Sequence, residues 1–404
     1  PSVTVSGGAA YAASTAVTVS VSALDVPAAP GGVASGLASV QLSNDGFTTS
    51  TTFPIADTIA WTLAAGADAG RTVSARFVDR AGNVSAIVSD GITLDTAAPA
   101  AGSITLAGNP EATAGNTGTP VVTATLTTSD ANGGAGNANL EVQLSNSSGF
   151  AGATWQAFTS PMAWVLLPGD GAKTVYARFR DPAGNVSTFV QASITLAATA
   201  PTSGSIVVEG GAPATNKSAT ALNVTVGATG ATQMRLSVNG TAGSWIPYAT
   251  STTVAASGLA DETPAAISVL FRNAGGIEGA AASTSILVDR RAPTSGTVAV
   301  NAGASYASST SVTLAVSAVD APLTTGSASG LASVQVSNDA FATSQTFAMA
   351  DTIPWTLAAG ADGARTVSVR FVDRAGNVSA VVTDGITLDT ALPLPGTMSL
   401  SGNP

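Results

Sequence analysis

The sequence contains no cysteine and no histidine among its 404 residues. Without cysteine, no disulfide can stabilise a domain, and no thiolate can act as a nucleophile or a metal ligand. Without histidine, the chain lacks the commonest general base and the commonest metal ligand. A Ser-His-Asp triad and a zinc site built from cysteine or histidine are therefore excluded.

Charged side chains are also scarce, at 9% of the residues, whereas an average protein has about 25%. The 24 acidic and 14 basic residues give a net charge of -10. This excess of negative charge disfavours nucleic acid as a partner and is compatible with divalent cations. No run of about 18 apolar residues is present, so we expect no membrane insertion within this sequence.

One block of sequence occurs twice: RTVSARFVDRAGNVSAIVSDGITLDTA at 71–97 and RTVSVRFVDRAGNVSAVVTDGITLDTA at 365–391. Weaker copies at 173–199 and 266–292 give four copies at a spacing of about 90 to 100 residues. A domain of about 100 residues can bury about 65% of its unfolded surface and can fold alone. We predict domain 1 at 1–97, domain 2 at 98–199, a divergent domain 3 at 200–291, domain 4 at 292–391, and the first strand of a further repeat at 392–404.

The final segment, TALPLPGTMSLSGNP at 390–404, parallels TAAPAAGSITLAGNP at 96–110. Domain 4 closely matches domain 1, whereas adjacent domains differ, which indicates a larger unit of three domains and about 295 residues. The sequence opens at Pro1 without a charged and apolar leader. We therefore expect it to be a window on a longer array.

Short runs rich in Val, Thr, Ile and Phe alternate with polar residues and end at Gly, Pro, Asn or Asp, which is typical of half-buried strands. In domain 1 these runs lie near 3–6, 16–23, 38–43, 51–55, 59–63, 72–79 and 84–94. About seven strands per copy predict an all-β fold of tandem immunoglobulin-like β-sandwich domains arranged head to tail. We expect Phe77 and Phe371 in the cores, and a tight hairpin at 79–83, because Gly82 and Asn83 tolerate positive φ.

Each copy ends in a short segment that contains a proline, namely Pro99, Pro201, Pro293 or Pro393, and a new strand follows at once. Proline fixes its own φ and keeps the preceding residue extended. Bending between successive domains should therefore be restricted. At about 3.3 Å per strand residue, four domains in series would form a rod of roughly 150 Å.

The hairpin DRAGNVS, the closing strand ITLDTAAP, the strand VQLSND and the WTL motif occur in a fixed order. Together they resemble the tandem Ig-like repeats of large bacterial surface adhesins and related secreted proteins, over all four copies. The resemblance implies an extended stalk, extracellular or at the cell surface, that carries a terminal binding domain away from the cell. It also implies calcium near the domain junctions, bound through aspartates.

Carried onto this sequence, the resemblance assigns junction acids, hairpin acids and a further acid on the last strand. Calcium requires six to eight oxygen ligands, which Asp79, Asp90 and Asp95 could supply together with backbone carbonyls. The alternative is that Asp79 caps the hairpin and Asp95 accepts backbone amides. The candidate metal ligands are Asp79, Asp90, Asp95, Asp289, Asp373, Asp384 and Asp389, with Asp181 as the hairpin acid of domain 2.

Two domains depart from this acidic pattern. Domain 2 has Ala197 at the junction position and Ala192 where Asp90 or Asp384 stands in the other copies. Domain 3 keeps Asp289 but has Asn273 in its hairpin. Calcium is the one cofactor that the resemblance suggests, and we identify no catalytic residue.

The five tryptophans fall into two groups. Trp61, Trp164 and Trp355 recur at one position, which predicts a packing role, whereas Trp155 and Trp245 are better candidates for an exposed platform that stacks on sugars. Paired carboxylates for glycoside hydrolysis are not identifiable, because Asp261 and Glu262 form a lone pair in a predicted loop.

The sequence thus predicts a non-catalytic structural segment of a large secreted or cell-surface adhesin or extracellular filament, acting as a stiff extended spacer. Its partners would be neighbouring repeats of the same chain, and its low charge would permit lateral self-association into fibres. The alternative is a set of glycan-binding or spacer modules of a secreted polysaccharide-active enzyme. That alternative predicts exposed aromatic rings along one face.

Overall fold

A computed structural model describes residues 1–130, 137, 139–323, 325–399 and 401. Strands hold 49% of the residues, and the helices of the described part are three 3-10 turns, η1 (Ser6–Gly8), η2 (Glu209–Gly211) and η3 (Asn301–Gly303). The predicted all-β fold of tandem β-sandwiches is confirmed. In the same residues no helix has the length and apolarity to cross a membrane.

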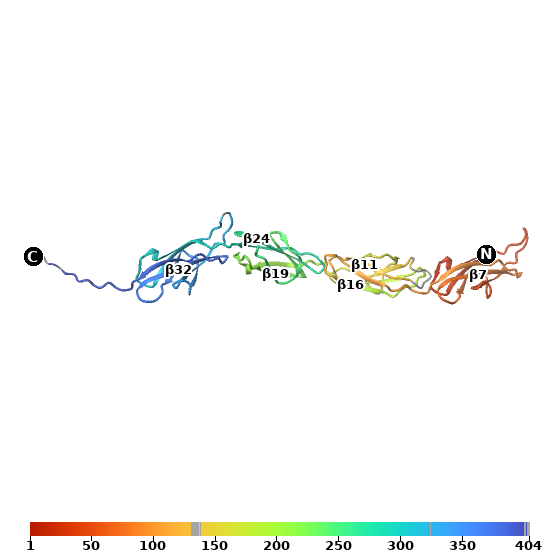
Figure 1. Ribbon diagram of the computed structural model, residues 1–404. Helices are drawn as coiled ribbons and strands as arrows, with labels where there is room; N and C mark the ends of the chain where they lie inside the picture. The colour runs from red at the N-terminus through yellow and green to blue at the C-terminus, as the bar shows by residue number, and fades with distance from the viewer. Residues whose placement is uncertain (131–136, 138, 324, 400, 402–404) are drawn as a thin grey trace. The chain divides into compact units, whose positions relative to one another are not determined.

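Domain 1 pairs a three-stranded sheet with a five-stranded sheet. The small sheet has the order β1 (Ser2–Val5), β3 (Ala16–Ser22), β6 (Thr58–Thr62). The large sheet has the order β2 (Tyr11–Ala12), β8 (Val88–Leu94), β7 (Ala69–Asp79), β4 (Leu37–Ser43), β5 (Thr51–Pro54). Only the short β2 runs parallel to its neighbour, β8. Figure 1 places β7 in this first sandwich.

The other domains repeat this arrangement of a small and a large sheet. In domain 2 the small sheet has the order β14 (Met162–Val165), β11 (Val121–Thr127), β9 (Ser103–Ala107). Its large sheet has the order β10 (Asn116–Thr117), β16 (Val190–Leu196), β15 (Gly171–Arg180), β12 (Glu141–Ser145), β13 (Gln156–Ala157). In domain 3 the small sheet has the order β17 (Thr202–Val208), β19 (Leu222–Thr229), β23 (Ser251–Val254). Its large sheet has the order β18 (Ala214–Thr215), β25 (Ala282–Val288), β24 (Thr263–Arg272), β20 (Gln233–Val238), β21 (Thr241–Ala242), and β22 (Ile246–Pro247) also pairs with β20.

Domain 4 follows the strand order of domain 1. Its small sheet has the order β26 (Thr294–Val300), β28 (Ser311–Val319), β31 (Thr352–Thr356). Its large sheet has the order β27 (Tyr306–Ala307), β33 (Val382–Leu388), β32 (Gly363–Asp373), β29 (Leu331–Ser337), β30 (Gln345–Ala348).

Each sandwich encloses its own hydrophobic core, because alternate residues of facing strands point inward. Along β7, the inward side chains of Val73, Ala75 and Phe77 are all buried. Phe77 and Phe371 are core residues, as predicted. In the part of the chain that the structure describes, each buried cluster draws its residues from a single predicted domain.

The recurring tryptophans have the predicted packing role. Trp355 is buried in the core of domain 4, while Trp61 and Trp164 are half-buried against theirs. Each indole N–H donates to an asparagine Oδ1, that of Asn338, Asn44 and Asn146 respectively, at 2.8 to 3.0 Å. This bond satisfies the polar atom of a ring that is otherwise removed from water.

The last strand of domain 1 starts later than the predicted residue 84. Only Val84 makes an isolated bridge, to Val78, and the strand β8 begins at Val88. The reason is Ser85, whose hydroxyl accepts the Phe77 backbone N–H at 3.0 Å and replaces a ladder bond between the strands.

The predicted first strand of a further repeat, at 392–404, does not form in the described residues 392–399 and 401. A strand needs a hydrogen-bonded neighbour, and its counterpart in domain 2, β9, pairs with β11. Among the described residues, 392–399 and 401 have no strand beside them. Residues 400 and 402–404 lie outside the described residues.

The chain divides into two compact units. The first comprises Pro1–Thr199 with Ala274–Ile277, and the second comprises Ala200–Asn273 with Glu278–Pro404. The first unit therefore contains the junction between domains 1 and 2, and the second contains the junction between domains 3 and 4.

Candidate functional site at the domain junctions

The hairpin after β7 is closed by an aspartate and an asparagine. Asp79 accepts the Asn83 backbone N–H at 2.7 Å and the Asn83 side-chain amide at 2.8 Å, and Gly82 has a φ of 92°. These bonds, led by that of the Asn83 side chain, lower the pKa of the Asp79 carboxyl. Asp181 with Asn185 and Asp373 with Asn377 form the same closure. The predicted tight hairpin is therefore present.

The proposed grouping of Asp79, Asp90 and Asp95 is not brought together. Leu94 pairs with Ala69 at the start of β7, whereas Asp79 ends that strand, so Asp95 and Asp79 lie at opposite ends of the sandwich, roughly 30 Å apart. Asp90 accepts the backbone N–H of Val5 at 2.7 Å and so joins the two sheets. In domain 4, Asp384 does the same with Val300, at 2.8 Å.

The junction between domains 1 and 2 instead gathers acids from both domains. Asp95 from the end of domain 1 lies with Asp130 and Asp181 of domain 2, with carboxylate oxygens within 4.8 Å of one another. All three are buried. The Asn185 side-chain amide donates to the backbone carbonyl of Asp95 at 2.8 Å, so the hairpin of domain 2 holds the end of domain 1.

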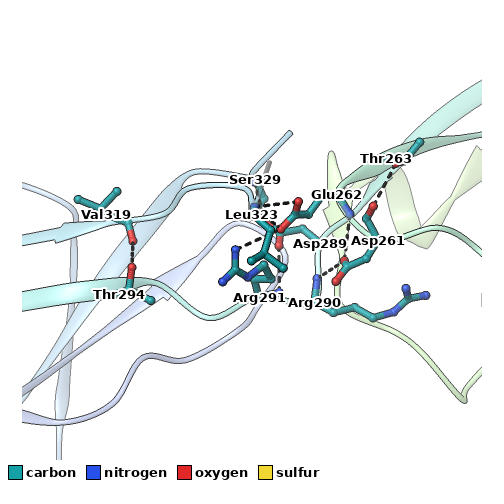
Figure 2. Close-up of polar contacts among 10 residues, drawn as sticks. All are labelled: Asp261, Glu262, Thr263, Asp289, Arg290, Arg291, Thr294, Val319, Leu323 and Ser329. Carbon is teal, nitrogen blue, oxygen red and sulfur yellow. Dashed lines mark hydrogen bonds and ion pairs between the residues drawn. The ribbon is translucent and has the colours of Figure 1, made fainter. Parts of the chain in front are cut away.

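The junction between domains 3 and 4 has the same construction, with Asp289, Asp320 and Asp373 within 4.8 Å. Asn377 donates to the Asp289 carbonyl at 2.8 Å, and the Ser329 backbone N–H donates to Asp289 Oδ2 at 2.7 Å. Figure 2 shows this second bond. Burial, followed by repulsion from Asp289 and Asp373, raises the pKa of the Asp320 carboxyl.

Asp130 and Asp320 were missed in the sequence, although a signal for them exists. The strand registers pair Ser2 with Ser22, Ser103 with Thr127 and Thr297 with Ser317. The third residue after each of these partners is an acid: Asp25, Asp130 and Asp320.

Domain 3 lacks the acid at this register position. Its register pairs Ser205 with Gly227, which places Gly230 where the other domains have aspartate. Domain 3 also has Asn273 in its hairpin, and the preceding domain ends in Ala197. The three acids are thus present together or absent together, which indicates that they act as one set.

A fourth acid fixes the segment that follows each junction acid. Asp68, in the loop before β7, accepts the Thr96 backbone N–H at 2.8 Å. Asp170, Asp261 and Asp362 do the same for Ala198, Arg290 and Thr390, at 2.8 to 2.9 Å. These bonds hold the backbone immediately after the end of the last strand.

The junction between domains 3 and 4 has an additional contact through Glu262. Both carboxylate oxygens of this mostly buried residue accept the Leu323 backbone N–H, at 2.9 and 3.0 Å, as Figure 2 shows. The Glu262 carbonyl accepts the Ser327 N–H at 2.9 Å. A Cβ on Gly326 would lie 2.5 Å from the Glu262 Cβ, so only glycine fits there. Arg291 lies 3.4 Å from the carboxylate.

The two acidic clusters have the chemistry of a calcium site. Calcium binds six to eight hard oxygen ligands at 2.3 to 2.6 Å, so two of its ligands can lie up to about 5 Å apart, and 4.8 Å is compatible. The three carboxylates of each cluster, at least two of them buried, repel one another unless protons or a cation offset their charge. Bound calcium would be held by these three aspartates and would supply that positive charge. Asp389, whose Oδ1 accepts the Ala391 N–H, is exposed in the described structure.

The two remaining tryptophans lie outside the cores, under arginine side chains. The Arg178 and Arg180 guanidinium carbons lie 5.4 and 4.6 Å from the Trp155 ring centroid. Those of Arg235 and Arg272 lie 4.7 and 4.3 Å from Trp245. Both rings are half-buried by these cation–π contacts. A sugar-stacking role for them stays a prediction.

No family model matches this sequence, and no curated protein does. Among solved structures, the fibronectin(III)-like modules of Clostridium thermocellum CbhA share 13% identity with a TM-score of 0.32, covering 48% of this chain and 100% of that one. Domains FN1 to FN3 of chicken CNTN1 share 14% identity with a TM-score of 0.29, covering 71% of this chain and 98% of that one. These are likenesses of β-sandwich modules in tandem and do not bear on activity.

Proposed function

We propose that this chain is a non-catalytic structural segment of a large secreted or cell-surface protein, of the adhesin or filament kind, that acts as a stiff extended spacer. The observation that carries the proposal is the construction of the junctions inside the two units. At each of them, the end of one sandwich is hydrogen bonded by the hairpin of the next and closed over three clustered carboxylates, of which all three are buried at the first junction and two at the second.

Calcium completes this proposal, because it would join acids from two domains through one ion. Asp95 and Asp289 come from the end of one domain, and the other two acids of each set come from the next. An ion shared in this way resists relative movement of the two domains. Without it, the same three charges oppose the junction.

Small-angle X-ray scattering of the whole chain, in millimolar calcium and in chelator, tests the spacer function. We expect an extended particle of roughly 150 Å in calcium, and a broader distribution of distances in chelator. The variant Asp320→Asn should reduce the calcium response, because it removes one ligand while keeping an oxygen for the Gly330 N–H, which donates to Asp320 at 2.7 Å.

The matched control is Asp351→Asn, which makes the same charge change on an exposed residue away from both clusters. Its scattering should follow the parent protein in both conditions. A compact particle in calcium, or freely jointed domains in both conditions, would rule out the stiff spacer.

A further inference from the structure

The N-terminal face of domain 1 repeats the surface with which domain 4 receives domain 3. We define this face as residues 24–36, between β3 and β4, together with the hairpin at 79–83. Asp25 accepts the Gly36 N–H at 2.7 Å, as Asp320 accepts that of Gly330. The Arg80 N–H donates to the Gly36 carbonyl at 2.9 Å, as Arg374 donates to Gly330.

The groups that hold Asp289 in domain 4 have direct counterparts on this face. Ser329 N–H and the Asn377 side-chain amide bind Asp289, and Ser35 and Asn83 occupy the equivalent positions. The Asn83 amide donates to Asp79 and retains a second hydrogen. Among residues 1–130, 137, 139–323, 325–399 and 401, none accepts a hydrogen bond from the Ser35 backbone.

The groups that receive Glu262 are also repeated. Leu323 is the third residue after Asp320, as Ala28 is after Asp25. Ser327 lies three residues before Gly330, as Val33 lies three residues before Gly36. Gly326, where a Cβ would collide with Glu262, lies four residues before Gly330, and Gly32 takes the same place before Gly36. In the part of the chain that the structure describes, the Ala28 and Val33 amides have no acceptor. The neighbouring Leu24 and Val33 side chains are 86% and 96% exposed.

We propose that this face is a docking surface for the C-terminal end of a domain of the domain 3 type, placed directly before domain 1. Such an end combines an aspartate at the position of Asp289 with a glutamate at that of Glu262. The strand registers pair Ala69 with Leu94, Gly171 with Leu196 and Gly363 with Leu388, as they pair Thr263 with Val288. Glu262 is therefore an extra residue between Asp261 and β24 that the other three domains lack, and domain 2 also has Ala197 at the position of Asp289. Domain 3 alone carries both acids, which commits the surface to that partner.

This inference rests on the proposed function, because the incoming aspartate would meet Asp25 and Asp79 as Asp289 meets Asp320 and Asp373. The experiment extends the full chain by a copy of residues 200–296 joined to Ser2, which keeps the spacing of the junction between domains 3 and 4. Residue-resolved hydrogen exchange is measured in millimolar calcium. The amides of Ala28, Val33 and Ser35 should exchange at least about 10-fold more slowly than in the parent chain.

Two controls accompany it. An added copy that carries Glu262→Ala and Asp289→Ala should lose this protection, and an added copy of residues 98–204, which ends in the domain 2 manner, should not give it. The amides of Leu323, Ser327 and Ser329 in the same molecule serve as the internal standard, because they are bonded across the existing junction.

The outcomes separate the two proposals. If the three standard amides exchange fast, the junction within the chain is not closed, and the proposed spacer function fails with it. If they are slow while Ala28, Val33 and Ser35 are unchanged by the added domain, only the docking surface is wrong. Equal protection by the domain 2 copy would overturn the assigned partner.

Discussion

At the scale of single residues, side chains repeatedly bind the backbone of a turn. Asp45, between β4 and β5, accepts the Ser43 hydroxyl at 2.7 Å, the Thr49 N–H at 2.8 Å and the Thr49 hydroxyl at 2.7 Å. Asp339 makes the same three bonds with Ser337 and Thr343. These donors, led by the threonine hydroxyl, lower the pKa of both carboxyls to about 2.

This pair gives a prediction in acid. A carboxyl with a lowered folded pKa stabilises the turn fully above its unfolded value of about 3.9. That contribution is lost as the pH falls through about 2. In an NMR titration, both carboxyls should stay ionised at pH 3, and the Thr49 and Thr343 amides should shift with them near pH 2. Thr49→Val should raise the pKa of Asp45 and leave that of Asp339 unchanged, and midpoints near 3.8 in the parent would contradict the assignment.

At the scale of elements, the loop before β7 is held by one arginine. Arg71 donates to the carbonyls of Ala64 at 2.9 Å, Ala67 at 2.6 Å, and Ala69 and Gly70 at 3.2 Å. Arg365 holds the equivalent loop of domain 4. Because this loop carries Asp68, which binds Thr96, the guanidinium also positions the backbone that enters the next domain.

We therefore predict that Arg71→Lys lowers the free energy of unfolding of domain 1 by about 1 to 2 kcal/mol, since an ammonium cannot reproduce the planar set of donors. Chemical denaturation measures this, and hydrogen exchange at Thr96 should quicken. Arg80→Lys is the control, because the Arg80 side chain donates no hydrogen bond to any described residue. An equal loss of unfolding free energy in both variants, or no loss in either, would show that the loop does not depend on the Arg71 guanidinium.

The strands also show how much of the fold and of the candidate site could be predicted from the sequence. Period-two alternation located the main strands, because inward positions such as Val73 and Phe77 are fixed by burial. It missed the late start of β8, since Ser85 substitutes a hydroxyl for a ladder bond. The family resemblance grouped Asp79 with Asp90 and Asp95, whereas an antiparallel pair of strands carries Asp79 away from Asp95. Asp130 lies after a strand in a loop that differs between copies, so only the strand register reveals its equivalence to Asp320.

At the scale of the whole molecule, the acids form two complete sets among the described residues. The face of domain 1 and the end of domain 4 each carry part of a set, Asp25 with Asp79 and Asp389 respectively. A single carboxylate or a pair offers too few oxygen ligands for calcium to bind tightly.

We predict that the chain binds two calcium ions, one for each complete set. Native mass spectrometry or calorimetric titration should give this number. Asp320→Asn should reduce it to one, and the double variant with Asp130→Asn should abolish tight binding. Retention of both ions in the double variant would show that they bind elsewhere.

The four separate cores have a consequence for a chain under tension. Because each hydrophobic cluster closes within a single sandwich, pulling on the two ends can rupture one sandwich while its neighbours survive. Each rupture would release about 100 residues of slack, roughly 300 Å of extra reach at about 3.4 Å per residue. A chain built in this way would lengthen one domain at a time, and each unfolding event would lower the force on the domains that are still folded.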